Sequence, residues 1–168
     1  MENQEISQPI KLIIQFWESN NKQITQLFNK YPDHVYAGKV APGRNSGLYL
    51  LAHLVAVSDG LFTILGLGDK KFPELQQFVG ESETAINYQV DINELRAKWD
   101  NINALLTAEF ATKDSDWWLD RHMSVSPEDF AKEPHRNKLN VLLSRASHEN
   151  YHRGQLVFLT EELISQQY

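Results

Sequence analysis

Two histidines near the carboxyl end of the chain have the spacing of a metal-binding pair. His148 and His152 are four residues apart in a segment that is predicted to be helical. On an α-helix this spacing places both imidazoles on one face, one turn apart, where they can bind one metal ion. The same spacing is also common by chance on solvated helix faces. A metal site therefore needs a further ligand from elsewhere in the chain.

His53 is a candidate for that ligand. It is the only histidine in residues 48–57, which are apolar nearly all round, and burying a charged imidazole there would be costly. Each of the three histidines alone could be a hydrogen-bonded core residue, but one metal ion would satisfy one nitrogen of each at once. Three histidine ligands leave a coordination position open to water or substrate, as in catalytic sites. The other histidines are expected at the surface: His34, His122 and His135.

The pair also matches H-E-x-x-H, the zinc metalloprotease pattern in which the glutamate is a general base. The surroundings disfavour a protease, because only 16 residues follow His152 and no strand is predicted to bind a peptide. The longer pattern H-E-x-x-H-x-x-G-x-x-H fails, since Gln155 and Phe158 occupy its glycine and histidine positions. Glu149 is therefore expected to be solvated or to contact a metal ligand without binding the metal itself, and a role as catalytic base stays open.

The three residues after the pair suggest local roles. Gly154 costs a helix roughly 1 kcal/mol relative to alanine, so we expect a neighbouring helix to approach it closely. Arg153 could pair with an acid such as Glu149, and Gln155 could orient a ligand imidazole. For Arg153 and Gln155, ordinary surface hydrogen bonding is the alternative.

Length and composition limit the fold and the partners. The 168 residues suit one domain, residues 1–168, and 42% of them are apolar. A net charge of -6 disfavours nucleic acid, and the absence of cysteine excludes disulfides, thiolate metal sites and cysteine nucleophiles. No apolar run reaches about 18 residues and the first residues do not resemble a signal peptide, so we expect a cytoplasmic protein without a membrane partner.

Four helices are predicted to position the histidines, and no segment indicates a strand. Apolar residues recur with helical spacing in about residues 9–30, 47–65, 92–113 and 136–166. The sequence thus predicts an all-α protein, a four-helix bundle with long connections between helices two and three and between helices three and four.

Trp117 and Trp118, in the second long connection, either cover one end of the core or line a ligand pocket. Asn20 and Asn21 interrupt the first apolar stripe, either at an exposed turn or facing a polar cavity.

The histidine in helix two, followed about 95 residues later by His-x-x-x-His-Arg-Gly-Gln, resembles the DinB/YfiT-like superfamily over essentially the whole chain. The resemblance implies a four-helix bundle in which His53, His148 and His152 bind a divalent metal, nickel or zinc ahead of iron or manganese. It also implies a homodimer. Some similar proteins transfer low-molecular-weight thiols to electrophiles, one branch is a thiol-dependent isomerase, and others are described as hydrolases. Some members have another histidine where this chain has Ser144.

These observations lead to one main hypothesis and two alternatives. The main hypothesis is a metal-dependent transferase or hydrolase that acts on a small molecule, with any thiolate coming from a co-substrate. The first alternative is a non-catalytic metal-binding protein of the stress response, since the family is named for damage-inducible expression. The second is the H-E-x-x-H zinc peptidase with Glu149 as its base.

Overall fold

The computed structural model describes residues 6–86, 89–161 and 165. Within these residues the chain forms α-helices and 3-10 helices and no strand, only two isolated bridges, so the all-α prediction is confirmed. The elements in chain order are α1 (Gln8–Phe28), η1 (Asp33–Ala37), α2 (Gly47–Ile64), η2 (Pro73–Val79), η3 (Glu83–Ala85), α3 (Ile92–Phe110), α4 (Ser115–Leu119), α5 (Pro127–Lys132) and α6 (Lys138–Leu156).

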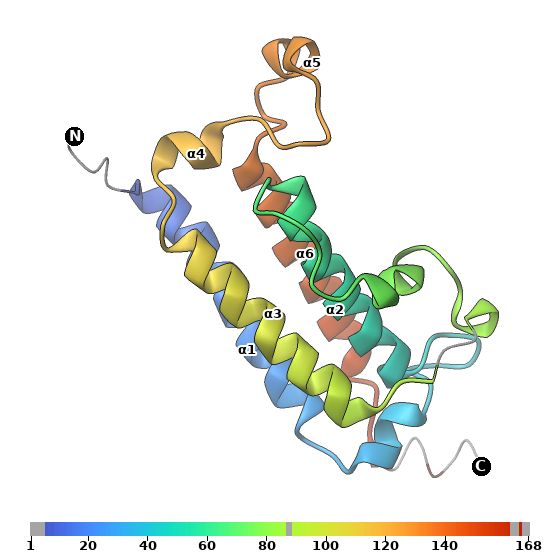
Figure 1. Cartoon of the computed structure of the whole chain (residues 1–168). Helices are drawn as coiled ribbons and strands as arrows, with labels where there is room; N and C mark the ends of the chain where they lie inside the picture. The colour runs from blue at the N-terminus through green and yellow to red at the C-terminus, as the bar shows by residue number, and fades with distance from the viewer. Residues whose placement is uncertain (1–5, 87–88, 162–164, 166–168) are drawn as a thin grey trace.

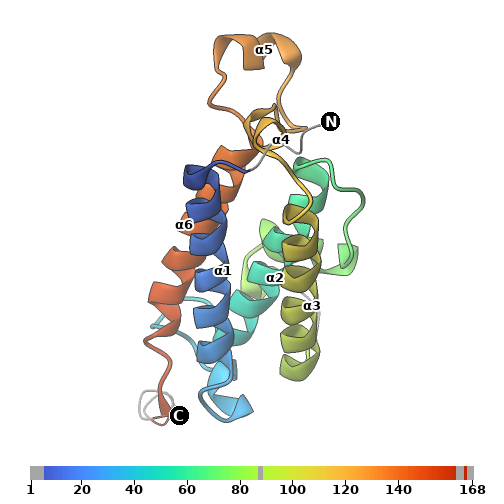
Figure 2. The same cartoon turned by 90° about the vertical axis from the view of Figure 1, so that its left-hand side faces the viewer.

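The four long helices, α1, α2, α3 and α6, lie side by side (Figure 1 and Figure 2). Helix α1 contacts α3 and α6, and α2 also contacts both α3 and α6. The short helices α4 and α5 lie at one end of this arrangement and η1 lies at the other. The two histidines of α6 and the histidine of α2 therefore lie on neighbouring helices.

Helix α2 is the most buried element. By length and composition it is the one described helix that could cross a membrane, but 72% of that window is buried inside the protein, as in the core helix of a soluble domain. The Ser46 hydroxyl caps its first turn by accepting from the Tyr49 N–H at 3.1 Å. Gly66, with φ of +75°, ends it in the left-handed region that favours glycine.

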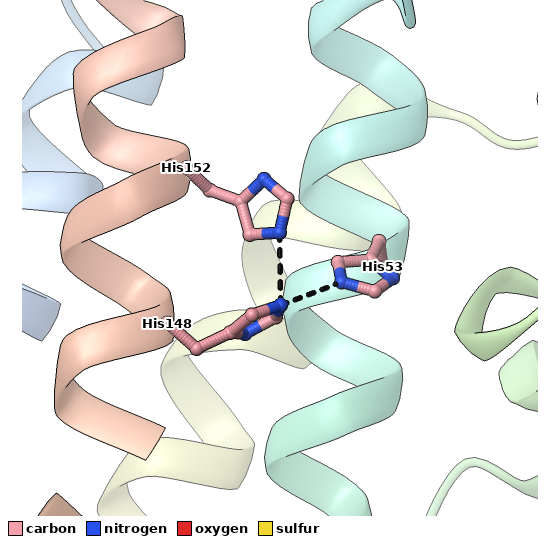
Figure 3. Close-up of side chains that lie close together, drawn as sticks. All are labelled: His53, His148 and His152. Carbon is pink, nitrogen blue, oxygen red and sulfur yellow. Dashed lines mark hydrogen bonds between the residues drawn. The ribbon is translucent and has the colours of Figure 1, made fainter. Parts of the chain in front are cut away.

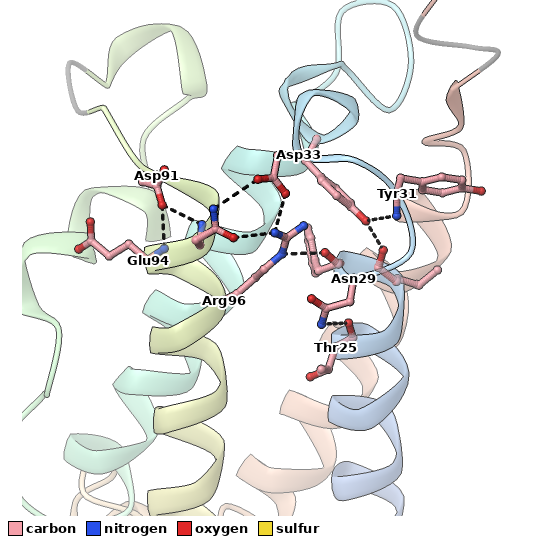
Figure 4. Close-up of polar contacts among 11 residues, drawn as sticks. Thr25, Asn29, Tyr31, Asp33, Asp91, Glu94 and Arg96 are labelled. Atoms are coloured by element: carbon pink, nitrogen blue, oxygen red, sulfur yellow. Dashed lines mark hydrogen bonds and ion pairs between the residues drawn. The ribbon is translucent and has the colours of Figure 1, made fainter.

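An arginine joins the end of α1 to the start of α3. The Arg96 Nε–H donates to the carbonyl oxygen of Phe28, one of the last carbonyls of α1, at 2.8 Å, and Nη1 donates to Asp33 Oδ1 at 2.6 Å (Figure 4). Asp91 caps α3 by accepting from the N–H groups of Asn93 and Glu94. These contacts fix the connection at the η1 end of the helices.

The long connections contain more structure than predicted. Residues 114–133 hold α4 and α5, and residues 73–85 hold η2 and η3. Trp118 is fully buried against Phe110, with ring centroids 4.9 Å apart, so it closes one end of the core. This is the first of the two roles considered for the tryptophan pair.

The last helix is shorter than predicted. It ends at Leu156, and residues 157–160 are not helical, although residues 161 and 165 within the predicted range are helical again. Residues 162–164 and 166 of that range lie outside the described part. The chain leaves the helix so that Leu159, which is 1% exposed, packs over Gly47 at the start of α2. Phe158, within the same apolar run, points to solvent instead.

A buried aspartate holds the connection that follows α2. Asp59 is 1% exposed, and its carboxylate accepts from the N–H groups of Lys71 at 2.6 Å and Phe72 at 2.9 Å.

We expect Asp59→Ala to lower the free energy of unfolding by about 2 kcal/mol, because both donors lose a charged acceptor. Urea titrations would measure this. Asp69→Ala, in the exposed part of the same connection, should change stability by less than about 0.5 kcal/mol. Equal effects would show that the two hydrogen bonds are not stabilising.

Candidate metal centre

The three predicted histidines converge on one point between α2 and α6. His148 Nε2 lies 3.3 Å from His53 Nε2 and 3.0 Å from His152 Nε2 (Figure 3). One nitrogen of each ring lies within 4.8 Å of the others, a separation that one metal ion can bridge. His152 is buried, and the other two are partly buried. No other group of three histidines or acids within the described residues is close enough to hold a metal.

The outer nitrogens of two rings are held by acceptors. His53 Nδ1 lies 2.6 Å from the carbonyl oxygen of Phe78, and His152 Nδ1 lies 2.7 Å from Gln155 Oε1. The Gln155 amide is oriented by its Nε2, which donates to the Tyr151 hydroxyl at 3.2 Å. Both Nδ1 atoms therefore carry the proton, which leaves the two Nε2 lone pairs free to bind a metal. The prediction that Gln155 orients a ligand imidazole agrees with this contact.

Hydrogen bonds among the three histidines alone cannot satisfy their three inner nitrogens. His53 Nε2 and His152 Nε2 are both bare, so only His148 can supply a proton, and one N–H cannot point at both neighbours. A divalent ion would accept all three lone pairs at once. The donor set therefore fits a metal ion better than it fits a network of hydrogen bonds.

The electrostatic surroundings keep the histidines neutral. Burial, the neighbouring His152 and the positive charge of Arg145 lower the pKa of His148 to about 4. Burial is also the main cause that lowers the pKa of His53 and of His152, while the acceptors on their Nδ1 atoms partly oppose the shift. Neutral imidazole is the form that binds metals, so little free energy is needed to remove protons before binding at pH 7.

A tyrosine on the same helix packs against the ring of His53 and another packs against the ring of His152. On α2, Tyr49 lies one turn before His53 and their rings are parallel, with centroids 6.3 Å apart. The Tyr49 hydroxyl donates to the carbonyl oxygen of Glu81 at 2.6 Å. On α6, the Tyr151 ring meets His152 edge-on at 5.1 Å. The connection after α2 thus supports His53 twice, through Phe78 and through Tyr49.

Glu149 lies away from the histidines. Its side chain is fully buried, and Oε1 accepts from the Trp17 indole N–H of α1 at 3.1 Å. The expectation of a solvated Glu149 is therefore wrong. Burial raises the pKa of this carboxyl to about 8, and the opposing effects of Arg145 and Trp17 are smaller. Because the carboxyl faces α1 while the histidines face α2, it does not lie where the base of a zinc peptidase must lie.

The structure decides two other local predictions. Arg153 donates to the Gln23 amide oxygen of α1 in an exposed hydrogen bond, which is the surface alternative, and it does not pair with Glu149. A side chain added at Gly154 would meet no atom within 4 Å, so no neighbouring helix approaches this glycine. Asn20 and Asn21 are buried, which excludes the exposed turn, and the Asn20 amide donates to the carbonyl oxygen of Ala146 on α6 at 3.1 Å.

Arg145 was not predicted to be near the site. It lies three residues before His148 on α6. Its positive charge contributes to the lowered pKa of His53 and of His148 and opposes the raised pKa of Glu149. Its Nε is buried and has no hydrogen-bond partner among the described residues. The i, i+3 spacing from the first histidine was the signal in the sequence that could have identified it.

Comparison with known proteins agrees with this picture. A family model described as the DinB family matches residues 3–163, which is nearly the whole chain. A search of the curated proteins finds no match. The match includes all three clustered histidines and all four long helices. The chain therefore belongs to the DinB family.

Proposed function

We propose that this protein is a metal-dependent enzyme in which His53, His148 and His152 bind one divalent ion. The observation that carries the proposal is the convergence of three Nε2 atoms, two of them on rings whose Nδ1 protons are already held by acceptors. Three protein ligands leave positions for a substrate. Bound there, the ion would supply Lewis-acid chemistry, lowering the pKa of a thiol or of water.

Among the reactions expected from the sequence, transfer of a thiol to an electrophile is supported best. A free thiol titrates near 8.5 and water near 15.7, so a thiol needs far less help to lose its proton. Glu149, the carboxylate nearest to the histidines in sequence, is turned toward Trp17 and cannot serve as a base at the site. A metal ion held by three histidines can also lower the pKa of bound water to about 7, so hydrolysis is the second candidate reaction.

Two measurements test the proposal together. Protein purified without a histidine tag should contain about one divalent ion per chain. It should also accelerate the reaction of a small thiol, such as cysteine or glutathione, with 1-chloro-2,4-dinitrobenzene. In this reaction a sulfur–carbon bond forms, chloride leaves with the bonding electron pair, and the thiol proton passes to the buffer. Because the chain has no cysteine, all thiol consumed is co-substrate.

The outcomes separate the alternatives. Bound metal without turnover of any thiol would favour the non-catalytic metal-binding protein of the stress response. Absence of bound metal, even after incubation with nickel or zinc, would overturn the proposal. The homodimer, the choice of nickel or zinc, and the absence of nucleic-acid and membrane partners stay predictions. Light scattering and the same metal analysis test the first two.

A further inference from the structure

A pocket of about 220 Å³ opens beside the imidazole of His152. One wall is the end of α6, with Tyr151 and Gln155, and the other is the turn that precedes α2, with Arg44 and Asn45. This volume is below the range of pockets for drug-sized ligands, so it suits a small molecule or one end of a larger one. Because His152 lines the pocket, a molecule bound there would lie next to the histidine cluster.

The turn before α2 holds Arg44 in the wall of this pocket. The Arg44 N–H donates to the carbonyl oxygen of Ala41 at 3.0 Å, and the Val40 N–H donates to that of Asn45 at 3.1 Å. Gly43, with φ of +69°, supplies the left-handed conformation that the turn requires. No ion pair or side-chain hydrogen bond engages the Arg44 guanidinium within residues 6–86, 89–161 and 165, so its five N–H donors are available to a ligand.

The charge around the pocket is positive, although the whole chain carries a net charge of -6. Arg44 lines the pocket, and the positive charge of Arg145 acts on His53 and His148. The three imidazoles are neutral ligands, so a bound divalent ion would keep its full charge. Glu149, which could have balanced it, faces α1 instead. A molecule with an anionic group would be attracted to such a site.

We propose that this pocket binds an oxyanion group of the substrate, a carboxylate or a phosphate, through the guanidinium of Arg44. The planar fork of an arginine matches either group with two parallel hydrogen bonds. Asn45 and Tyr151 line the same pocket and offer further polar contacts. The inference extends the proposed function, on which it rests, by naming the substrate class: a small acid whose reactive part reaches the histidine cluster when the acid group lies on Arg44.

Titration of small anions followed by NMR tests this inference. Acetate and methyl phosphate would be added separately to ¹⁵N-labelled protein at low salt, once without metal and once loaded with zinc. We expect the Arg44 Nε–H and the Asn45 backbone N–H to shift in both forms, with tighter binding in the zinc form. Arg44→Gln should weaken binding about tenfold or more, because a charge-assisted bidentate contact is lost, and Arg44→Lys should weaken it less. The anion with the higher affinity, acetate or methyl phosphate, identifies the acid group of the substrate.

The control is Arg136→Gln, which removes the same charge from a position just before the first residue of α6, where Arg136 pairs with Glu133. Its anion affinity should match that of the wild type. Equal affinities for wild type and Arg44→Gln, or shifts that occur only away from the pocket, would overturn the inference. Zinc binding that persists in that case would leave the proposed metal site intact. Arg44-dependent binding in protein that takes up no metal would instead support the pocket and overturn the proposed function.

Discussion

Replacing His148 by alanine is expected to reduce the affinity for zinc or nickel by more than about 100-fold, because the loss of a direct ligand should exceed the 10- to 100-fold cost of losing an outer partner. His148 has the largest effect of the three histidines on geometric grounds. Its Nε2 lies between the other two, at 3.3 Å from one and 3.0 Å from the other. Without His148, only two ligands remain, His53 on α2 and His152 on α6, and the nitrogen that lay between theirs is lost.

Isothermal titration with zinc at pH 7.5 would measure this loss, and thermal unfolding would report it independently. An ion that binds only the folded protein stabilises it by about 2.7 kcal/mol at 100 times its dissociation constant. Added zinc should therefore raise the melting temperature of the wild type and leave that of His148→Ala nearly unchanged. His135→Ala, a histidine outside the cluster, is the matched control and should behave as the wild type.

Gln155→Leu separates ligand orientation from direct binding. It removes the acceptor that lies 2.7 Å from His152 Nδ1 while keeping a side chain of similar volume. The expected loss of metal affinity is about 10- to 100-fold, smaller than for His148→Ala. If both variants bound zinc as tightly as the wild type, the cluster would not be the metal site, and the proposed function would fail with it.

The helices that carry the site could be predicted because periodicity is strong where one face is buried. In α3 the buried residues recur at steps of three and four, and the predicted stripe is the observed one: Ile92, Leu95, Trp99, Ile102, Leu106 and Phe110. The third ligand, His53, could be predicted for a different reason. It is the only histidine in a stretch of α2 that is apolar nearly all round, so a charged imidazole there would be costly unless it bound a partner.

The burial of Glu149 could not be predicted from the H-E-x-x-H pattern, because the pattern does not show which face of the helix the glutamate occupies. It lies seven residues after Leu142 and seven before Leu156, and all three are buried. Seven residues are nearly two helical turns, so Glu149 occupies a core position between two leucines. The mixed apolar residues at the start of α6 obscured this stripe. Arg44 could not have been identified either, because a turn, and no periodic element, brings it beside His152.

The second large effect concerns the stability of the metal-free protein and comes from this buried glutamate. Its carboxyl is fully buried, and Oε2 has no hydrogen-bond partner among the described residues. Burial raises the pKa of Glu149 in the folded protein to about 8, from 4.5 for the ordinary side chain. Between these values the folded state holds a proton that the unfolded state has released. The contribution of Glu149 to stability is therefore fully present below pH 4.5 and is lost as the pH rises to about 8.

Glu149→Gln should remove this dependence. The glutamine amide oxygen can still accept from the Trp17 indole N–H, and the side chain has nearly the same shape but no charge. Relative to the wild type, the variant should gain roughly 2–5 kcal/mol of stability between pH 5 and pH 9. Urea titrations of both proteins with a chelator, at pH 5, 7 and 9, would measure this difference. The titrations of His53, His148 and His152 largely cancel in it.

Glu128→Gln, at an exposed position of α5, is the control and should differ from the wild type by the same small amount at every pH. A difference for Glu149→Gln that also stays constant from pH 5 to pH 9 would contradict the expectation. It would mean that Glu149 is ionised at neutral pH, with Arg145 as its counter-ion. The positive charge of Arg145 would then be neutralised on α6, and Arg44 alone would supply the attraction for an anionic substrate. The pH dependence of one buried side chain therefore also tests how charge is distributed around the histidines.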